Sequence, residues 1–480
     1  MEKKPKPPVK TREGDQKSKT GVYVYVRVRP LLKLERLKKN VTHLEGLKLT
    51  SDLPESGQVV ALEAPRPIGG FDGVFGEKEN NVSVFKHAFL PRLSTVMKGG
   101  TASLFCYGYT GAGKTHTVFG SDSAKEIGLY RLAADELLGK ITKENDTNPD
   151  LQKNPLMLQI TVAEVYNDVV FDLLGERKKC TLRINKSGQL MVRGTTKKTT
   201  LSAEEAKKKG AKFAVVTSGI TTMIVQSSED LDKIQKLSSK HRAVGSSTEH
   251  DQSSRSHAIF RLDIVNQPLL DAMNELEETE SIKPAMQTEY AKKRTMELRH
   301  RIIAVEKKIE GLNATIESMF RKGHPLGGKM MVVDLAGSDS DARDIGTNGH
   351  TAQQRKESQA INKSLLALKE CIRGLQTRQT KKLPFRNSQM TRLLEEVLMP
   401  TTEKDTDSVM LVNVAPPSHL SKKTVNSMRY GQMFAVRKVV KKPVSRIASR
   451  RGPSKALLEA KRRARAQAAK AKAKTGVNLK

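Results

Sequence analysis

A glycine-rich octapeptide in the first quarter of the chain has the residues that a phosphate site needs. Its members are Gly108, Tyr109, Thr110, Gly111, Ala112, Gly113, Lys114 and Thr115. They fit the pattern G-x-x-x-x-G-K-[S/T], in which backbone N–H groups surround phosphates, the lysine reaches the β and γ oxygens, and the hydroxyl ligates Mg²⁺. We expect a helix to begin at Gly113 or Lys114, so that the positive end of its dipole faces the anion.

An acidic residue follows a second apolar run of the chain. A loop of this kind that hydrolyses ATP also needs an acid near the metal and a group that senses the γ-phosphate. The run Met330–Val333 ends at Asp334, and Gly337 comes three residues later. This order predicts Asp334 at a strand tip facing Mg²⁺, with the Gly337 N–H able to reach the γ-phosphate.

A third segment combines hydroxyls with a guanidinium. Ser253, Ser254, Arg255, Ser256 and His257 lie directly before an apolar, β-type run. Serine-rich loops are common and usually only solvated, but the two elements already found favour a loop that closes on the nucleotide. Together the three segments predict ATP as ligand and Mg²⁺ as its metal.

Apolar β-type runs alternate with amphipathic helices, as in a sheet with helices on both faces. The expected strands are Val22–Val28, Thr101–Tyr107, Leu156–Val162, His257–Val265, Lys329–Val333 and Ser408–Val414. The sequence therefore predicts an α/β protein with a central, mostly parallel twisted sheet.

The three segments, in this order, resemble the P-loop, switch I and switch II of the kinesin superfamily. Further similar segments are Arg27–Pro30, His116, Glu164–Asp168, Asp172–Leu174, Ile361–Leu368, Leu383–Ser388 and Thr391–Leu394. The resemblance extends from about Val22 to Val440 apart from an insert. It implies a kinesin motor fold of the P-loop NTPase class, a microtubule-stimulated ATPase and tubulin as partner.

The resemblance also implies roles for single residues at the nucleotide. The end of the first strand, with Arg27, Arg29 and Pro30, would form the adenine pocket, and His116 would lie beside the base. Thr115 and Ser254 would coordinate Mg²⁺, with Asp334 behind a water, while Gly337 would link the γ-phosphate to switch II.

Two positions depart from the kinesin pattern in ways that bear on hydrolysis. Arg255 would pair with Asp339 to close the site, yet kinesins normally have Glu at the latter position, so the reach is one methylene shorter. His250 stands where switch I usually begins with Asn. No phosphate or metal ligand is removed, so we expect ATPase activity. Whether these two residues make hydrolysis slower or differently gated stays open.

Several stretches are most similar to the kinesin-13 family, which removes tubulin from microtubule ends. They are Leu366–Arg373, Gly128–Asp135 and His241–Thr248. That family's long loop with a Lys-Val-Asp tip has no counterpart between Leu62 and Phe71, and its long basic segment ahead of the motor is reduced here. Depolymerisation, force generation and static microtubule binding with weak ATPase activity all remain open.

The charge of the chain indicates a polyanionic partner. Lys and Arg number 85 against 52 acidic residues, and the formal net charge is +33, which favours an acidic surface. Residues matched to the tubulin-binding helices and loop are Lys369, Arg373, Lys381, Lys382, Arg386 and Arg392. The segment 441–480 is basic and has no aromatic residue to stack on bases, so we favour tethering to microtubules over nucleic-acid binding.

The stretch 268–328 interrupts the resemblance and has a heptad seam, formed by Leu298, Ile302, Val305, Ile309, Leu312, Ile316 and Met319. A helix packed on its own domain, an intrachain helical hairpin and a dimerising coiled coil through 298–319 all fit this seam. The expected organisation is thus an extension over 1–20, a motor domain over 21–440 with the insert inside it, and a tail over 441–480.

Three cysteines lie far apart, and no run of about 18 apolar residues occurs. We therefore expect a soluble intracellular protein without membrane contact. By resemblance it would lie in the cytoplasm on the microtubule cytoskeleton, including the spindle or a flagellum.

Overall fold

The computed structural model describes residues 20–37, 59–62, 68–121, 125–184, 190–200, 213–244, 254–321, 323–338, 352–376, 383–399 and 405–435. The chain divides into two units, Met1–Val436 and Arg437–Lys480, and the described residues all belong to the first. Of the single site and surface residues named above, His250, Ser253, Asp339, Lys381 and Lys382 lie outside the described ranges. Residues 1–19, the end of the stretch His241–Thr248 from residue 245 onward, and the tail over 441–480 lie outside them as well.

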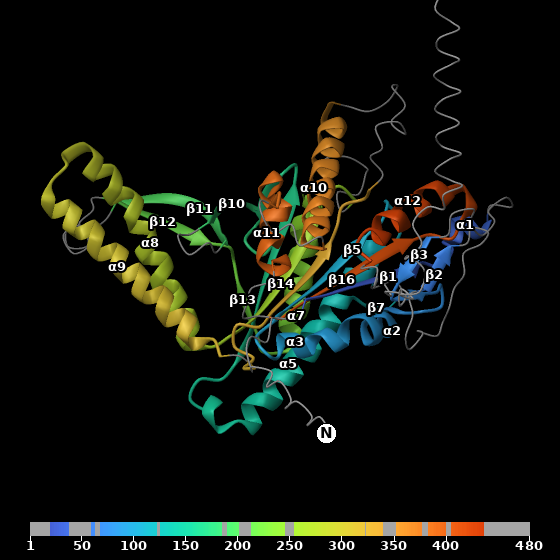
Figure 1. Ribbon diagram of the computed structural model, residues 1–480, viewed down its shortest axis with the longest axis horizontal. Helices are drawn as coiled ribbons and strands as arrows, with labels where there is room; N and C mark the ends of the chain where they lie inside the picture. The colour runs from blue at the N-terminus through green and yellow to red at the C-terminus, as the bar shows by residue number, and fades with distance from the viewer. Residues whose placement is uncertain are drawn as a thin grey trace, which may run out of the picture. The chain divides into compact units, whose positions relative to one another are not determined.

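A large mixed sheet forms the centre of the first unit (Figure 1). Its strands are β1 (Thr20–Val28), β4 (Gly73–Phe75), β5 (Thr101–Tyr107), β8 (Met157–Tyr166), β9 (Val169–Asp172), β10 (Lys178–Ile184), β11 (Leu190–Thr200), β12 (Phe213–Gly219), β13 (Met223–Val225), β14 (His257–Val265), β15 (Lys329–Asp334) and β16 (Thr406–Val414). Two small sheets pair β2 (Val59–Leu62) with β3 (Ile68–Phe71), and β6 (Gly120–Ser121) with β7 (Glu126–Ile127).

Helices and short helical turns connect these strands. They are α1 (Lys33–Leu37), α2 (Asn81–Val84), η1 (Phe85–Phe89), η2 (Leu90–Arg92), α3 (Leu93–Val96), α4 (Lys114–Phe119), α5 (Leu129–Thr147), η3 (Pro149–Leu151), α7 (Ser228–Val244), α8 (Gln267–Lys293), α9 (Met296–Met319), α10 (Ala352–Gln376), η5 (Phe385–Asn387), α11 (Gln389–Leu398), η6 (Ser418–Leu420) and α12 (Ser421–Gln432). No helix among the described residues is both long and apolar enough to cross a membrane.

The strand order places the chemistry-bearing segments next to one another. The order is β12-β11-β10-β9-β8-β14-β15-β5-β16-β1-β4, with β13 also paired to β8. The strands from β15 through β5, β16 and β1 to β4 are parallel, whereas β14 is antiparallel to β15 and to β8. Because β15 pairs with β5 in register Asp334↔Cys106, both strands end at the same edge of the sheet.

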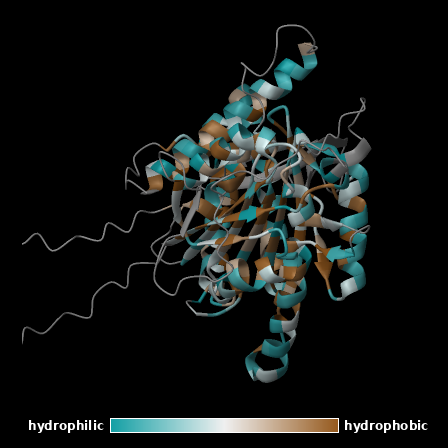
Figure 2. Ribbon diagram, turned by 90° about the vertical axis from the view of Figure 1, so that its right-hand side faces the viewer, coloured by the Kyte–Doolittle hydropathy of each residue, from teal (hydrophilic) through white to brown (hydrophobic). Residues whose placement is uncertain are grey.

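The strands are apolar on both sides, and this produces one hydrophobic core on each face of the sheet. On β5, Leu104 belongs to the core that includes α5 and α7, and Phe105 to the core that includes α10, α11 and α12. Successive side chains of a strand point to opposite faces, so continuous apolar runs fit strands that are covered on both sides. Figure 2 shows hydrophobic residues on many of the strands, while the helices carry both hydrophilic and hydrophobic stretches. The expected α/β fold class is confirmed.

The insert forms two packed helices, α8 and α9, coloured yellow in Figure 1. Arg294, between them, has φ 49° and ends α8. Ile309 and Ile316 of the heptad seam are buried in the same core cluster as Leu269 and Leu276 of α8. Of the three interpretations of the heptads, the structure shows the intrachain hairpin, and self-association of the chain remains a prediction.

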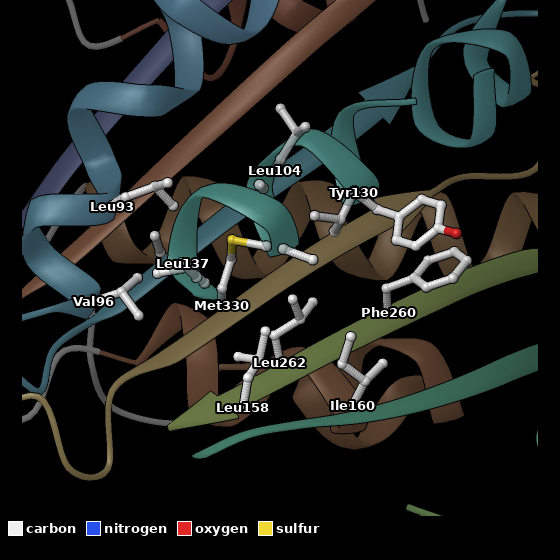
Figure 3. Packing of buried hydrophobic residues seen from close by; sticks show 14 of the residues in the cluster. Leu93, Val96, Leu104, Tyr130, Leu137, Leu158, Ile160, Phe260, Leu262 and Met330 are labelled. Atoms are coloured by element: carbon white, nitrogen blue, oxygen red, sulfur yellow. The ribbon is translucent and has the colours of Figure 1, made fainter. Parts of the chain in front are cut away.

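Aromatic rings fasten β14 to the helical layer above it (Figure 3). The ring of Phe260 stacks on that of Tyr130 from α5, with centroids 4.5 Å apart, and meets Phe119 from α4 edge-on at 5.0 Å. Phe260 is fully buried. Through Phe119, the helix after the phosphate loop, α4, therefore packs against β14.

We expect Phe260→Ala to lower the free energy of unfolding by about 3–5 kcal/mol, because the lost ring leaves a cavity under two other rings. The exposed Ile303 of α9, with 52% of its surface accessible, provides the control, since Ile303→Ala should change stability by less than about 0.5 kcal/mol. Urea titrations of both variants measure the difference. Equal losses in the two variants would contradict this account of the core.

Candidate nucleotide site

The glycine-rich loop lies between β5 and α4, and α4 begins at Lys114 as expected. Gly113 caps this helix with φ 94°, a left-handed conformation that disfavours a side chain. At Gly108 a Cβ would lie 2.3 Å from the backbone oxygen of Asn413 on β16, so only glycine permits this close approach. Lys114 is buried, and its Nζ donates a hydrogen bond to the backbone oxygen of Tyr109 at 3.0 Å.

Two of the residues at the free positions of the motif, Tyr109 and Ala112, are structural. Tyr109 is buried, and its hydroxyl accepts a hydrogen bond from the N–H of Ala415 at 3.0 Å and lies 3.2 Å from the Thr424 hydroxyl. Ala112 is buried in the same small cluster as Tyr109 and Ala415. Tyr109 therefore anchors the loop to the end of β16 and to α12.

Asp334 lies directly opposite the loop at the tip of β15 and is completely buried. Its Oδ2 accepts hydrogen bonds from the Thr115 hydroxyl at 2.9 Å and from Nη1 of Arg242 at 2.8 Å. Its other oxygen, Oδ1, is buried and has no hydrogen-bond partner among the described residues. A hydroxyl and a carboxylate with an open oxygen are the ligand types that Mg²⁺ prefers, so these residues fit that metal.

Arg242, near the end of α7, is a site residue that the motifs did not indicate. It is buried, and besides Asp334 it donates to the Ser256 hydroxyl at 3.2 Å and to the Ser256 backbone oxygen at 3.0 Å. A buried charge is costly without a partner, and Arg242 supplies the counter-charge of Asp334. It also ties the loop before β14 to the tip of β15.

The two switch-like segments meet next to the glycine-rich loop. The Gly337 N–H donates to the backbone oxygen of Ser254 at 2.8 Å, and the Ser338 N–H donates to that of Gly108 at 3.2 Å. Arg255 forms an ion pair with Glu357 of α10 at 2.7 Å. Its expected partner, Asp339, lies outside the described residues, so that pairing remains a prediction.

His257 connects the same region to α10. Its Nδ1 accepts a hydrogen bond from the Ala336 N–H at 2.9 Å, and its Nε2 lies 2.8 Å from the hydroxyl of Ser364. Burial, together with the charges of Arg242 and Lys114, lowers the pKa of His257 to about 3. The ring is therefore neutral, and the bond to Ala336 leaves the proton on Nε2.

Two of the residues expected at the adenine, Arg27 and His116, lie beside the same carboxylate, that of Glu126. Arg27 is buried and donates to Asn81 and to the Thr117 hydroxyl, the latter at 2.7 Å; burial lowers its pKa. His116 lies 3.2 Å from Glu126, and burial lowers the pKa of its ring despite that carboxylate.

A neighbouring ion pair fixes the second arginine of this strand end. Arg29 pairs with Glu35 of α1 through both η nitrogens, at 2.8 and 2.6 Å, and its Nε donates to the Gly111 oxygen at 2.7 Å. This hydrogen bonding lowers the pKa of Glu35. Pro30 is exposed. Arg29 therefore braces the phosphate loop in this structure.

The residues matched to a tubulin surface have unequal environments. Arg373 and Arg386 are exposed and Lys369 is half-buried. A cavity of about 350 Å³ beside Arg386 is lined by Lys363, Leu366, Ala367, Glu370, Arg386 and Asn387. Arg392, by contrast, donates to the Leu182 oxygen at 3.1 Å and to Gln389 at 3.2 Å, so its guanidinium holds β10 and α11 together.

We expect Arg242→Met to lower the free energy of unfolding by about 3–5 kcal/mol in the absence of nucleotide, because Asp334 would keep a buried charge without its counter-charge. Lys140→Met is the matched control. It removes a lysine from an exposed pair with Glu136 on α5, which is worth at most about 0.5 kcal/mol. Denaturant titrations that give the two variants similar stabilities would refute the role of Arg242.

Comparison with known proteins identifies the family of this chain. The family model described as kinesin motor domain matches residues 27–436. The mouse "Kinesin-like protein KIF24" is 28% identical over 426 residues, which cover 88% of this chain and 24% of that protein. The chain thus spans about a quarter of that relative.

Solved structures show the same fold at low sequence identity. One, described as "Structure of a fast kinesin: Implications for ATPase mechanism and interactions with microtubules", has a TM-score of 0.57 at 18% identity and covers 90% of this chain and 98% of its own. Another, of mutants that "reveal a signalling pathway for activation of the kinesin motor ATPase", has a TM-score of 0.54 at 23% identity, covering 86% and 99%. Because the kinesin motor-domain model matches residues 27–436, which is most of the chain, this chain belongs to the kinesin motor-domain family.

Proposed function

We propose that this chain is a microtubule-stimulated Mg-ATPase that couples hydrolysis to depolymerisation of microtubule ends or to force generation. Membership of the kinesin family implies an ATPase associated with the microtubule cytoskeleton. The observation that supports ATP hydrolysis by this chain is the convergence of Thr115, Asp334 and the Gly337–Ser254 bond at the phosphate loop.

Different residues would bind the phosphates, hold the metal and close the site. Backbone N–H groups of the loop and Lys114 would bind the phosphates of ATP, and Thr115, Ser254 and Asp334 would hold Mg²⁺. The metal supplies charge neutralisation to the transferred phosphoryl group. The Gly337 N–H, which donates a hydrogen bond to the Ser254 backbone oxygen, would reach the γ-phosphate once that bond breaks. Arg255 would close the site by pairing with Asp339.

The proposed tubulin surface lies over α10, η5 and the start of α11. Lys369, Arg373 and Arg386 supply positive charge there, and we expect Lys381 and Lys382 to add to it. The basic tail over 441–480 would supply a second, separate contact with tubulin. Attraction between exposed charges weakens within about 8–10 Å at physiological salt. We therefore infer that binding to the acidic surface of tubulin is electrostatically steered and sensitive to salt.

We expect Lys114→Ala to reduce microtubule-stimulated ATP hydrolysis by about 100-fold or more, because a charge that stabilises the transferred phosphoryl group is lost. Lys140→Ala removes a lysine from the exposed surface of α5 and should leave the rate unchanged. Steady-state phosphate release, with and without microtubules and over a range of salt, measures both. A wild-type rate that microtubules do not raise would favour a nonmotile scaffold with weak ATPase activity.

A second experiment separates the possible outputs of the ATPase. If the chain dismantles polymer ends, purified protein with ATP should shorten stabilised microtubules, whereas protein without ATP or the Lys114→Ala variant should not. Fluorescence microscopy of polymer length measures this directly. Unchanged length at saturating protein would reject depolymerisation, and a surface-gliding assay would then distinguish force generation from static binding.

A further inference from the structure

Tyr166, the last residue of β8, makes contacts with α10 that no phosphate-site motif accounts for. Its hydroxyl donates a hydrogen bond to Oε1 of Glu357 at 2.6 Å. Gln353, one turn earlier on α10, donates to the same Oε1 at 3.1 Å and to the hydroxyl oxygen of Tyr166 at 3.3 Å. One oxygen of the Glu357 carboxylate is therefore fixed by two neutral donors.

The other oxygen of Glu357 carries the ion pair with Arg255. Nη1 of Arg255 lies 2.7 Å from Oε2, and the Glu357 side chain is 6% exposed. A nearly buried carboxylate needs partners on both oxygens, and it can receive a guanidinium in good geometry only if its plane is fixed. Tyr166 thus orients the acceptor that holds Arg255.

The ring of Tyr166 is also in contact with a cation, the guanidinium of Arg177. The guanidinium carbon of Arg177 lies 5.8 Å from the centre of the Tyr166 ring and 4.4 Å from that of Phe171. Arg177 in turn pairs with the fully buried Glu164 at 2.9 Å. Burial and the hydrogen bond to Glu357 raise the pKa of Tyr166, so the hydroxyl keeps its proton and remains a donor.

The turn that follows Tyr166 touches both helices of the proposed tubulin surface. Asp168, with φ 60°, accepts a hydrogen bond from Lys363 of α10 at 3.0 Å and another from the Gln389 N–H of α11 at 2.7 Å. A displacement of α10 relative to the β8–β9 turn would change these contacts and the contact between Tyr166 and Glu357 together.

We propose that Tyr166 is a positioning residue: it holds Glu357 as the resting counter-ion of Arg255 and so keeps Arg255 away from the nucleotide until α10 moves. This inference rests on the proposed ATPase function, because it assigns Arg255 a second position at the nucleotide. The hydroxyl acts through Glu357 and touches no reacting atom. Its loss should release Arg255 more often in the absence of microtubules.

The test is Tyr166→Phe, which removes the hydroxyl and keeps the ring beneath Arg177. Because Gln353 still donates to Glu357, we expect a partial release of Arg255, with the basal ATPase rate raised roughly threefold to tenfold. The maximal microtubule-stimulated rate should stay within about twofold of wild type, since α10 is then already displaced. Release of a fluorescent ADP analogue without microtubules should accelerate by a similar factor, because the Ser254–Arg255 loop is less firmly anchored.

Tyr130→Phe is the matched control. It removes a buried tyrosine hydroxyl that donates to Gln235 at 3.0 Å, and it should alter neither the basal rate nor the stimulation ratio. A loss of packing alone would lower the basal and stimulated rates of Tyr166→Phe together, and that result, or unchanged rates, overturns the proposal. If the wild-type protein hydrolyses no ATP, the proposed function fails, and ADP-analogue release from the same variants then decides the role of Tyr166.

Discussion

A single buried carboxylate, that of Asp334, constrains the arrangement of the whole nucleotide region. A carboxylate without solvent is costly unless other groups neutralise it and donate hydrogen bonds to it. Here a hydroxyl from the phosphate loop and a guanidinium from α7 do so, and the second oxygen has no hydrogen-bond partner among the described residues. Pairing of β15 with β5, strand tip beside strand tip, brings these groups together. Small errors in that register would separate the acid from the loop.

Much of the fold and the centre of the site could be predicted from sequence because their signals are local. The six expected strands all exist, with ends that differ by at most four residues from the structure. The helix after the phosphate loop begins where the motif places it. Asp334 and Gly337 were found because an apolar run followed by an acid and a glycine is readable within ten residues. The α8–α9 hairpin was one of three interpretations, since a heptad seam does not reveal which surface covers it.

The partners that complete the site could not be predicted because they come from distant parts of the chain. Arg242 is separated from Asp334 by 92 residues, Arg255 from Glu357 by 102, and Tyr166 from Glu357 by 191. Arg242, Arg255 and Tyr166 each lie in a stretch that the sequence singles out, but nothing in that stretch identifies the partner, which only the folded sheet shows. Tyr109 is similar: it occupies a position that the motif leaves free, yet its hydroxyl joins three elements. Arg242 and Tyr109 are buried, whereas Arg255 and Tyr166 are only partly buried. What distinguishes all four is a contact with a distant part of the chain, which a single sequence does not display.

The α8–α9 hairpin connects the end of β14 to the start of β15, whereas the two switch segments adjoin the opposite ends of the same strands. Nine residues of β14 separate the two ends, which corresponds to about 26 Å at the rise of an extended strand. Natural variation in the length of this connection, or an affinity tag or fluorophore placed in it, would therefore leave the chemistry untouched. Because β14 and β15 connect the hairpin directly to the two switch segments, the hairpin is a suitable attachment point for measuring or applying force at a distance from the nucleotide.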